Sequence, residues 1–179
     1  PNIEFSMIET QIVINKLTKY DREPLLAIFS YPKIIEHYDV ARFKSIEIAD
    51  RLIAYFDTQF DSNTGIRWAI RSRTLGEFLG TCGFIHWYEF VCSAVVGSFA
   101  KDYWGKGYTT ESVGAIIHFI FSESLYFYVN CVELFILPSI KPPENQSKIR
   151  GSFRGNFARK CYRNNDFHDM NMFGILRNE

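Results

Sequence analysis

The stretch from Ala100 to Ser112, AKDYWGKGYTTES, holds the residues that are best placed for chemistry. Gly105 and Gly107 bracket Lys106, and a helical pattern follows at once. Glycine lets a backbone approach an anion closely because it has no Cβ, and lysine adds a mobile positive charge. The first amides of a helix lack intrahelical acceptors, so anions bind there. The sequence therefore predicts an anion-binding loop at residues 105–109, with an ordinary turn as the alternative.

The loop matches neither of the two common nucleotide-binding motifs. A P-loop has Ser or Thr after its Gly-Lys pair, whereas Gly107 follows Lys106 in this chain. A dinucleotide-binding fingerprint has a third small residue where Thr110 stands. We therefore expect a phosphate loop of another kind.

No metal site or disulfide framework is indicated by the cysteines and histidines. Cys82, Cys92, Cys131 and Cys161 stand far apart and form no Cys-x-x-Cys pair, so we expect free thiols. The four histidines are equally dispersed, and we expect ordinary core or surface roles for them. They are His37, His86, His118 and His168.

Size and charge limit the classes of protein that the chain can represent. A length of 179 residues suits one domain, so we expect a single domain over residues 1–179. Twenty Lys and Arg balance twenty Asp and Glu, which argues against DNA or an anionic membrane as a partner. The longest apolar run is shorter than the roughly 20 residues of a membrane span. We expect a cytoplasmic protein.

The elements around the loop are predicted from hydrophobic periodicity. Residues 12–17 alternate like a strand, residues 21–60 are helical in character, and three strand-like runs follow between residues 65 and 100. After the loop, apolar residues at spacings of three and four predict a helix; they are Val113, Ile116, Ile117, Ile120 and Phe121. We expect strands at 130–138 and 169–179, with a basic loop or short helix between them. This order indicates an α+β sheet protein.

Several short motifs, in this order, resemble the GNAT N-acetyltransferase superfamily, specifically the branch of ribosomal-protein alanine and serine acetyltransferases. The segment WGKGYTTE from Trp104 to Glu111 is similar to the pyrophosphate loop of that branch. LGTCGF at 79–84 is similar to its Ile-Gly-x-x-Gly strand, and PENQS at 143–147 to its Pro-Glu-Asn-x-x-Ser segment. The resemblance spans nearly the whole chain. It implies a mostly antiparallel mixed sheet flanked by helices, with two strands splayed at an acetyl-CoA notch.

The resemblance also implies acetyl-CoA as cosubstrate and a primary amine as acceptor, which would attack the thioester directly. The amine would belong to a protein N-terminus, such as that of a ribosomal protein, or to a small molecule. The protein would be a monomer or a homodimer. By matching position, Ser147 would protonate the departing thiolate. The cofactor-binding residues would be Gly97, Ser98, Phe99, Trp104, Gly105, Lys106, Gly107, Tyr108, Thr109 and Asn145.

A catalytically degenerate CoA-binding or protein-interaction module is the alternative. Residues 94–97 read Ala-Val-Val-Gly where the family has Glu-x-Gly-Tyr, and Arg154 replaces a glutamate proposed as general base in some members. The segment 145–153 is also shorter than the corresponding segment of the family. The base is therefore unassigned, and the carboxylates considered for it are Glu77, Glu89, Glu133 and Glu144. The basic segment 141–163 leaves RNA binding as a third, lower-ranked hypothesis.

Overall fold

The computed structural model describes the chain in several stretches. They are residues 11–35, 42–62, 64–85, 87–88, 91–93, 95–122, 131–136, 152–163 and 166–176. Side chains are described for residues 11–35, 42–62, 64–84 and 97–121.

The helices occupy the first half of the chain and the segment after the glycine loop. In chain order they are the 3-10 helix η1 (Lys19–Asp21), α1 (Arg22–Ser30), α2 (Pro32–Ile35), α3 (Ile46–Asp61), the 3-10 helix η2 (Lys101–Tyr103) and α4 (Tyr108–Ser122). The expected helical regions are confirmed. None of the helices in the described stretches is both long and apolar enough to cross a membrane.

The strands form two sheets. The first contains β1 (Ile12–Lys16), β2 (Gly65–Ser72), β3 (Phe78–Ile85) and β6 (Val95–Phe99), antiparallel in the order β1-β2-β3-β6. The second has the order β4-β5-β7-β9-β8. Its strands are β4 (Trp87–Tyr88), β5 (Val91–Ser93), β7 (Cys131–Ile136), β8 (Ser152–Arg163) and β9 (Asp166–Leu176). The expected α+β architecture is confirmed.

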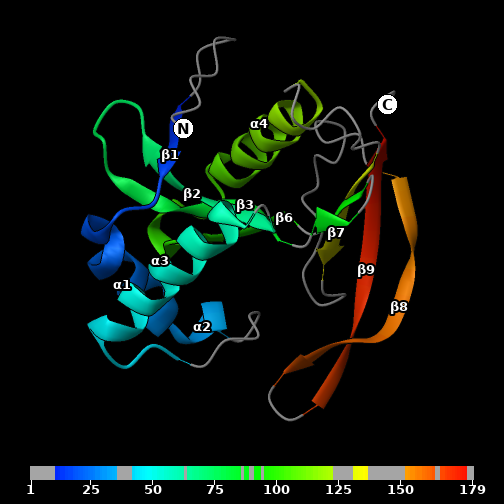
Figure 1. Cartoon of the computed structure of the whole chain (residues 1–179), viewed down its shortest axis with the longest axis horizontal. Coiled ribbons are helices and arrows are strands. Elements are labelled where there is room, and N and C mark those ends of the chain that lie inside the picture. Colours follow the sequence, from blue (N-terminus) through cyan, green and yellow to red (C-terminus); the bar gives the residue numbers. More distant parts are fainter. Residues whose placement is uncertain are drawn as a thin grey trace.

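Both faces of the first sheet are covered by helices (Figure 1). On one face, α4 buries Ile116 and Ile120 against a cluster that includes Trp68, Phe84 and Phe99. On the other face, α1 and α3 bury Leu25, Phe29, Ile53 and Phe56. Fully burying one such side chain contributes about 1.5–3 kcal/mol. The sheet is thus held between two apolar layers, and the loop that joins β6 to α4 is fixed at both ends.

The chain changes sheets between β5 and β6. β5 pairs in parallel with β7, from Val91 opposite Cys131 to Ser93 opposite Glu133. β6 pairs with β3 instead. β6 and β7 keep Cα atoms within 8 Å of each other, but no ladder joins them. Two neighbouring strands therefore part beyond Ser93, which confirms the expected splayed strands.

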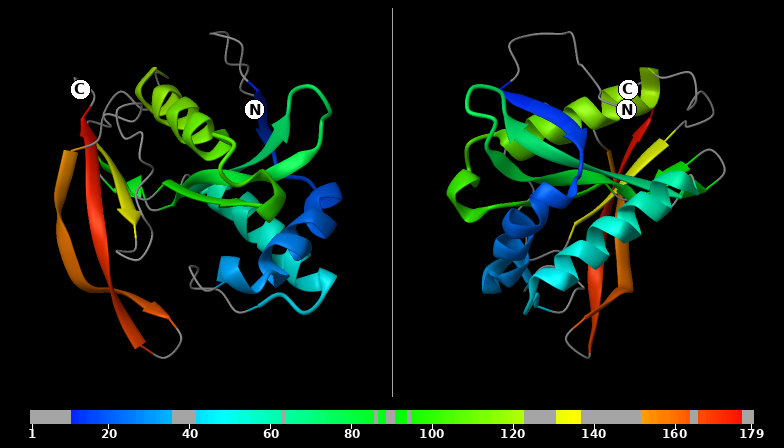
Figure 2. Two further views of the ribbon diagram at one scale, coloured as in Figure 1. Left: turned by 180° about the vertical axis from the view of Figure 1, so that it is seen from behind. Right: turned by 60° about the vertical axis from the view of Figure 1, so that its left-hand side comes forward.

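The prediction for the C-terminal region is wrong in one respect. The segment up to Arg163 is not a basic loop or short helix from Ser152 onward; it forms β8, paired antiparallel with β9. The register shifts twice, between Phe153 and Gly155 and between Phe157 and Cys161. Each shift breaks the alternation of apolar and polar residues, so the strand period is hidden in the sequence. Figure 2 shows this hairpin at the opposite end of the molecule from β1.

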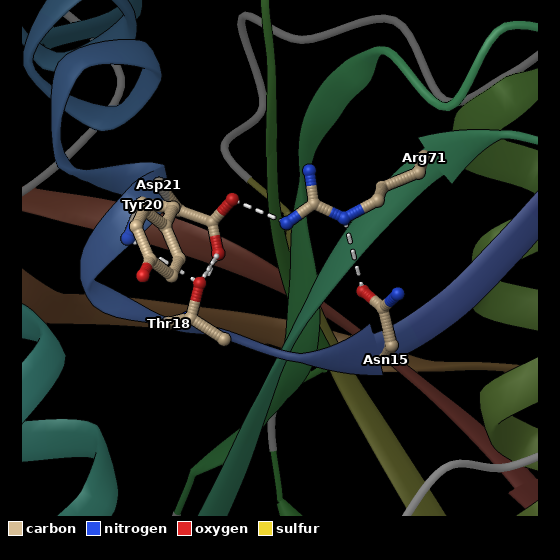
Figure 3. Close-up of polar contacts among 5 residues, drawn as sticks. All are labelled: Asn15, Thr18, Tyr20, Asp21 and Arg71. Carbon is tan, nitrogen blue, oxygen red and sulfur yellow. Dashed lines mark hydrogen bonds and ion pairs between the residues drawn. The ribbon is translucent and has the colours of Figure 1, made fainter.

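A buried carboxylate joins the start of α1 to the first sheet. Asp21 is 1% exposed and accepts hydrogen bonds from the backbone N–H of Thr18 at 2.8 Å and from its hydroxyl at 3.1 Å. The guanidinium of Arg71 in β2 forms an ion pair with the same carboxylate and also donates to Asn15 (Figure 3). This network sets where the helical layer begins relative to β1 and β2.

Removal of the Asp21 charge should destabilise the fold strongly. Asp21→Asn keeps the shape but leaves the guanidinium of Arg71 beside a neutral group, so we expect the free energy of unfolding to fall by about 3 kcal/mol. Asp57→Asn is the matched control, because Asp57 pairs with Lys16 at 2.9 Å while both side chains are about half exposed. That pair should contribute less than about 1 kcal/mol. Urea unfolding measures both changes, and equal losses would contradict the assignment.

Candidate functional site

The glycine loop leaves β6 through η2 and turns into α4 by means of two left-handed residues. Gly105 has a φ of +73° and Gly107 a φ of +85°, a region that residues with a Cβ rarely adopt. A Cβ at either position would meet no atom within 4 Å. The glycines are therefore required by the backbone conformation, and the space beside the loop is open on the side to which their Cβ atoms would point.

The loop carries backbone amides of the kind that bind anions. In the first turn of α4, the N–H of Glu111 donates to the carbonyl of Gly107 at 3.0 Å. The N–H groups of residues 105–110 donate to no acceptor among the described residues. Because α4 is 15 residues long, these amides also lie at the positive end of a full helix dipole. These amides are thus available to an anion, and anion binding by the loop stays a prediction.

Two side-chain hydrogen bonds hold the loop against the first sheet. The indole Nε1–H of Trp104 donates to the carbonyl of Phe99 at 2.7 Å. The hydroxyl of Tyr103 donates to the carboxylate of Glu77 at 3.3 Å, and its ring meets that of Tyr108 edge-on. Desolvation and the nearby Glu77 carboxylate raise the pKa of Tyr103, so its phenol stays protonated as the donor. Neither anchor is visible in the sequence, because Glu77 lies in the connection before β3 and Phe99 lies around a turn from Trp104.

Lys106 supplies positive charge at the loop. Its side chain is exposed, and Nζ lies over the ring of Tyr103, 5.6 Å from the centroid. This contact keeps the ammonium close to the loop amides while leaving it accessible to a ligand. The predicted role of Lys106 as a mobile charge beside an anion is consistent with this position.

The edge of β6 directs alternate backbone groups away from β3. The N–H of Ala100 donates to the carbonyl of Leu79, and the register places Ser98 opposite Thr81. Hydrogen-bonded and non-hydrogen-bonded pairs alternate in an antiparallel ladder. The backbone groups of Ser98 therefore face β3, whereas those of Gly97 and Phe99 face the side on which β7 lies. We expect an extended ligand on that side of β6 to lie along the backbone of Gly97 and Phe99.

Two side-chain hydroxyls are buried at facing positions of β3 and β6. Thr81 and Ser98 are 1% and 3% exposed, and neither hydroxyl has a hydrogen-bond partner among the described residues. An unpaired buried hydroxyl costs about 1–3 kcal/mol. We expect an ordered water to bridge them, since they occupy facing positions of β3 and β6.

The structure separates the carboxylates that were considered as bases. Glu133 in β7 lies opposite Ser93, the last paired position before the two strands part. Glu77 lies near the other end of β6, where it accepts the hydrogen bond from Tyr103. Glu89 and Glu144 lie outside the described residues. Glu133 thus occupies the position in β7 at which the two strands part, whereas Glu77 holds Tyr103 beside the loop.

Two further predicted site residues, Asn145 and Ser147, lie outside the described residues. His118 is exposed on α4, as expected for an ordinary surface histidine. Burial raises the pKa of the Cys82 thiol to about 12, so this free cysteine is inert. No cluster of potential metal ligands occurs within the described stretches.

A groove of about 360 Å³ between the end of β1 and α3 lies apart from the loop. Its charged lining includes Lys16, which is paired with Asp57 at 2.9 Å, and Asp50, which lies 3.8 Å from Arg22. Since Asp50 and Asp57 already have cationic neighbours, the groove has no unpaired carboxylate with which to bind a ligand. The loop and the gap beside β6 remain the candidate site.

Comparison with known proteins agrees with this geometry. The sequence profile of the acetyltransferase (GNAT) domain matches residues 11–146. YoaA of Bacillus subtilis (strain 168), an uncharacterized N-acetyltransferase, is 24% identical over 177 residues, covering 97% of this chain and 98% of the relative.

Solved structures share the fold at lower identity. RimL, a ribosomal-protein acetyltransferase in complex with coenzyme A, superposes with a TM-score of 0.75 at 14% identity and covers 97% of this chain and 98% of its own. Spermidine N-acetyltransferase from Vibrio cholerae, in complex with CoA and spermine, superposes with a TM-score of 0.74 at 13% identity and covers 94% and 96%.

Alanine at the two left-handed glycines should destabilise the protein through backbone strain alone. Gly105→Ala and Gly107→Ala should each lower the free energy of unfolding by about 1–2 kcal/mol, because alanine is strained at a positive φ. Steric clashes should add nothing, since the new Cβ meets no atom within 4 Å. Gly114→Ala, inside α4 and equally open, should instead raise it by about 1 kcal/mol through helix propensity. Urea unfolding of the three variants is the measurement. A loss at Gly114 equal to those in the loop would show that steric crowding decides.

Proposed function

Since this chain belongs to the acetyltransferase (GNAT) family, whose cosubstrate is acetyl-CoA, we propose that it transfers the acetyl group to a primary amine by direct attack in a ternary complex. The observation that carries the proposal is the set of loop amides, residues 105–110, without acceptors among the described residues. These amides, at the start of a long helix, suit the diphosphate of CoA. We further propose that residues 1–179 form a single acetyltransferase domain.

The residues of this chain divide the work of binding. The diphosphate would be held by Gly105, Lys106, Gly107, Tyr108 and Thr109. Gly105 and Gly107 would leave open space for it, and Lys106 would add a mobile charge. Gly97 and Phe99 would pair with the pantetheine arm through the backbone groups that face the gap. The backbone of Ser98 faces β3, so Ser98 would contribute to cofactor binding only as part of the strand along which the pantetheine arm lies. This division follows from the register and from the loop conformation.

Two proposed roles rest on resemblance in sequence. Asn145 would contact CoA, and Ser147 would give a proton to the departing thiolate. Orientation of two substrates and removal of one proton are the main demands of such a reaction. Bound acetyl-CoA would supply the activated thioester, while the chain would supply the backbone donors along β6 and the carboxylate of Glu133.

The acceptor is proposed as a protein N-terminus, a ribosomal protein included, or a small amine. Of the two solved structures compared above, one is a ribosomal-protein acetyltransferase and the other is a spermidine acetyltransferase. A degenerate CoA-binding module is the second candidate, favoured by the replacement of the family's Glu-x-Gly-Tyr with residues 94–97.

Release of free CoA thiol tests the proposal directly. The protein is incubated with acetyl-CoA and, separately, with peptides that begin with Ala or Ser, with spermidine and with an aminoglycoside. We expect amine-dependent thiol release with at least one of them. The buried Cys82 should add no background at neutral pH, because its thiol is not ionised. CoA binding by calorimetry without release would favour the degenerate module, and absence of CoA binding would contradict both candidates.

We predict that Glu133 binds or deprotonates the acceptor amine, because it occupies the last paired position before β5 and β7 part. Glu133→Gln should lower kcat by about 10²-fold or more and leave the KM for acetyl-CoA unchanged. Glu77→Gln is the matched control, since Glu77 lies near the loop end of β6, and its kcat should stay within about twofold. Equal kcat values for wild type and Glu133→Gln would refute the role.

A further inference from the structure

The indole of Trp104 makes a contact that the loop motif alone does not explain. Its Nε1–H donates to the carbonyl of Phe99 at 2.7 Å, across the turn formed by η2. The backbone N–H of Trp104 also donates to Lys101 at 3.1 Å. The residue directly before Gly105 is therefore tied both to the strand that precedes the loop and to the turn between them.

The carbonyl of Phe99 is the last one in β6 that faces away from β3. Once it accepts from Trp104, its direction is fixed, and the main route by which it would pair with water or with a ligand is occupied. The indole therefore closes the open edge of β6 at the point where the loop begins. Of the two backbone groups of Phe99, the N–H is then the one available to a ligand.

The outer side of the Trp104 ring rests on the helical layer. Its ring meets Tyr31 edge-on, with centroids 6.2 Å apart and an angle of 70° between the planes. Tyr31 lies between α1 and α2, where its N–H donates to Ile28 and its carbonyl accepts from Ile34. Lys101 covers the ring of Tyr31 at 5.5 Å. The indole is thus held on one side by a residue whose own backbone is fixed.

We propose that Trp104 is a positioning residue, which preorganises the amides of residues 105–109 by donating its indole N–H to Phe99. In this role it acts through the backbone of the loop, and ring stacking on the cofactor is not how it contributes. The order of the loop depends on the contacts above, whereas the effect on CoA affinity rests on the proposed function. Trp104 is 44% exposed, so direct stacking on CoA is the competing interpretation that the experiment must separate.

Replacement of Trp104 by 3-benzothienylalanine separates the two roles, because sulfur takes the place of the indole N–H while the ring keeps its shape. If Trp104 positions the loop, CoA should bind about five- to tenfold more weakly by calorimetry. In the ligand-free protein, the ¹⁵N order parameters of residues 105–109 should fall from about 0.85 towards 0.6. Tyr31→Phe, which keeps the ring contact, is the control and should match wild type in both measurements.

Unchanged loop order in the benzothienylalanine variant would overturn the proposal. Unchanged CoA affinity in this variant, together with weak binding by Trp104→Ala, would also overturn it and would favour stacking. Absence of CoA binding by the wild type would contradict the proposed function, whereas the order parameters would still decide the role of Trp104. A split in the kinetics gives a further readout. The KM for acetyl-CoA should rise about five- to tenfold with kcat unchanged, because the chemistry at the point where the strands part is not touched.

Discussion

The arrangement of the site depends on the single change of pairing partner between β5 and β6. β5 is hydrogen-bonded to β7, and β6 is hydrogen-bonded to β3, so consecutive stretches of one segment belong to different sheets. Because a backbone has only two hydrogen-bonding sides, the switch turns one side of β6 away from β3, toward the side on which β7 lies. The chain then passes through η2 into the glycine loop, where the indole of Trp104 donates back to the carbonyl of Phe99, so this residue links the end of β6 to the amides at the start of α4.

The rest of the fold holds these elements in place. Apolar layers on both faces of the first sheet fix β6 and α4 relative to each other, and the ion pair of Asp21 with Arg71 fixes the start of the helical layer. Tyr31 then connects that layer to Trp104. Precise placement of unpaired amides is possible only when the elements around them are rigid, since binding otherwise has to order the loop first.

Local pattern in the sequence was sufficient for most of the elements and for the loop. The helix after residue 107 follows from the spacing of its apolar residues, and the glycine loop follows from its motif, whereas the left-handed backbone at Gly105 and Gly107 comes from the structure. The glycines at 80 and 83 in the similar strand motif also have a physical reason, since a Cβ at Gly80 would lie 2.2 Å from the carbonyl oxygen of Ser98. The loop and the helix are thus visible in a single sequence, whereas the reason for Gly80 lies on the neighbouring strand.

Relations between distant residues could not be predicted in this way. The hydrogen bond of Tyr103 with Glu77 and the place of Glu133 where the strands part depend on strand register, which no spacing along the chain encodes. The two irregularities of β8 similarly removed the alternation by which a strand is recognised. The resemblance to a family supplied the overall arrangement, whereas the anchors of the loop required the structure.

The side of β6 that faces away from β3 also bears on how the protein behaves in a concentrated solution. An edge with outward-facing amides and carbonyls can accept a strand from another molecule, which is a common start of aggregation. A bound cosubstrate would occupy the same groups and so act as a removable cover. Purification and storage with added CoA should therefore yield a less aggregated preparation than the same steps without it.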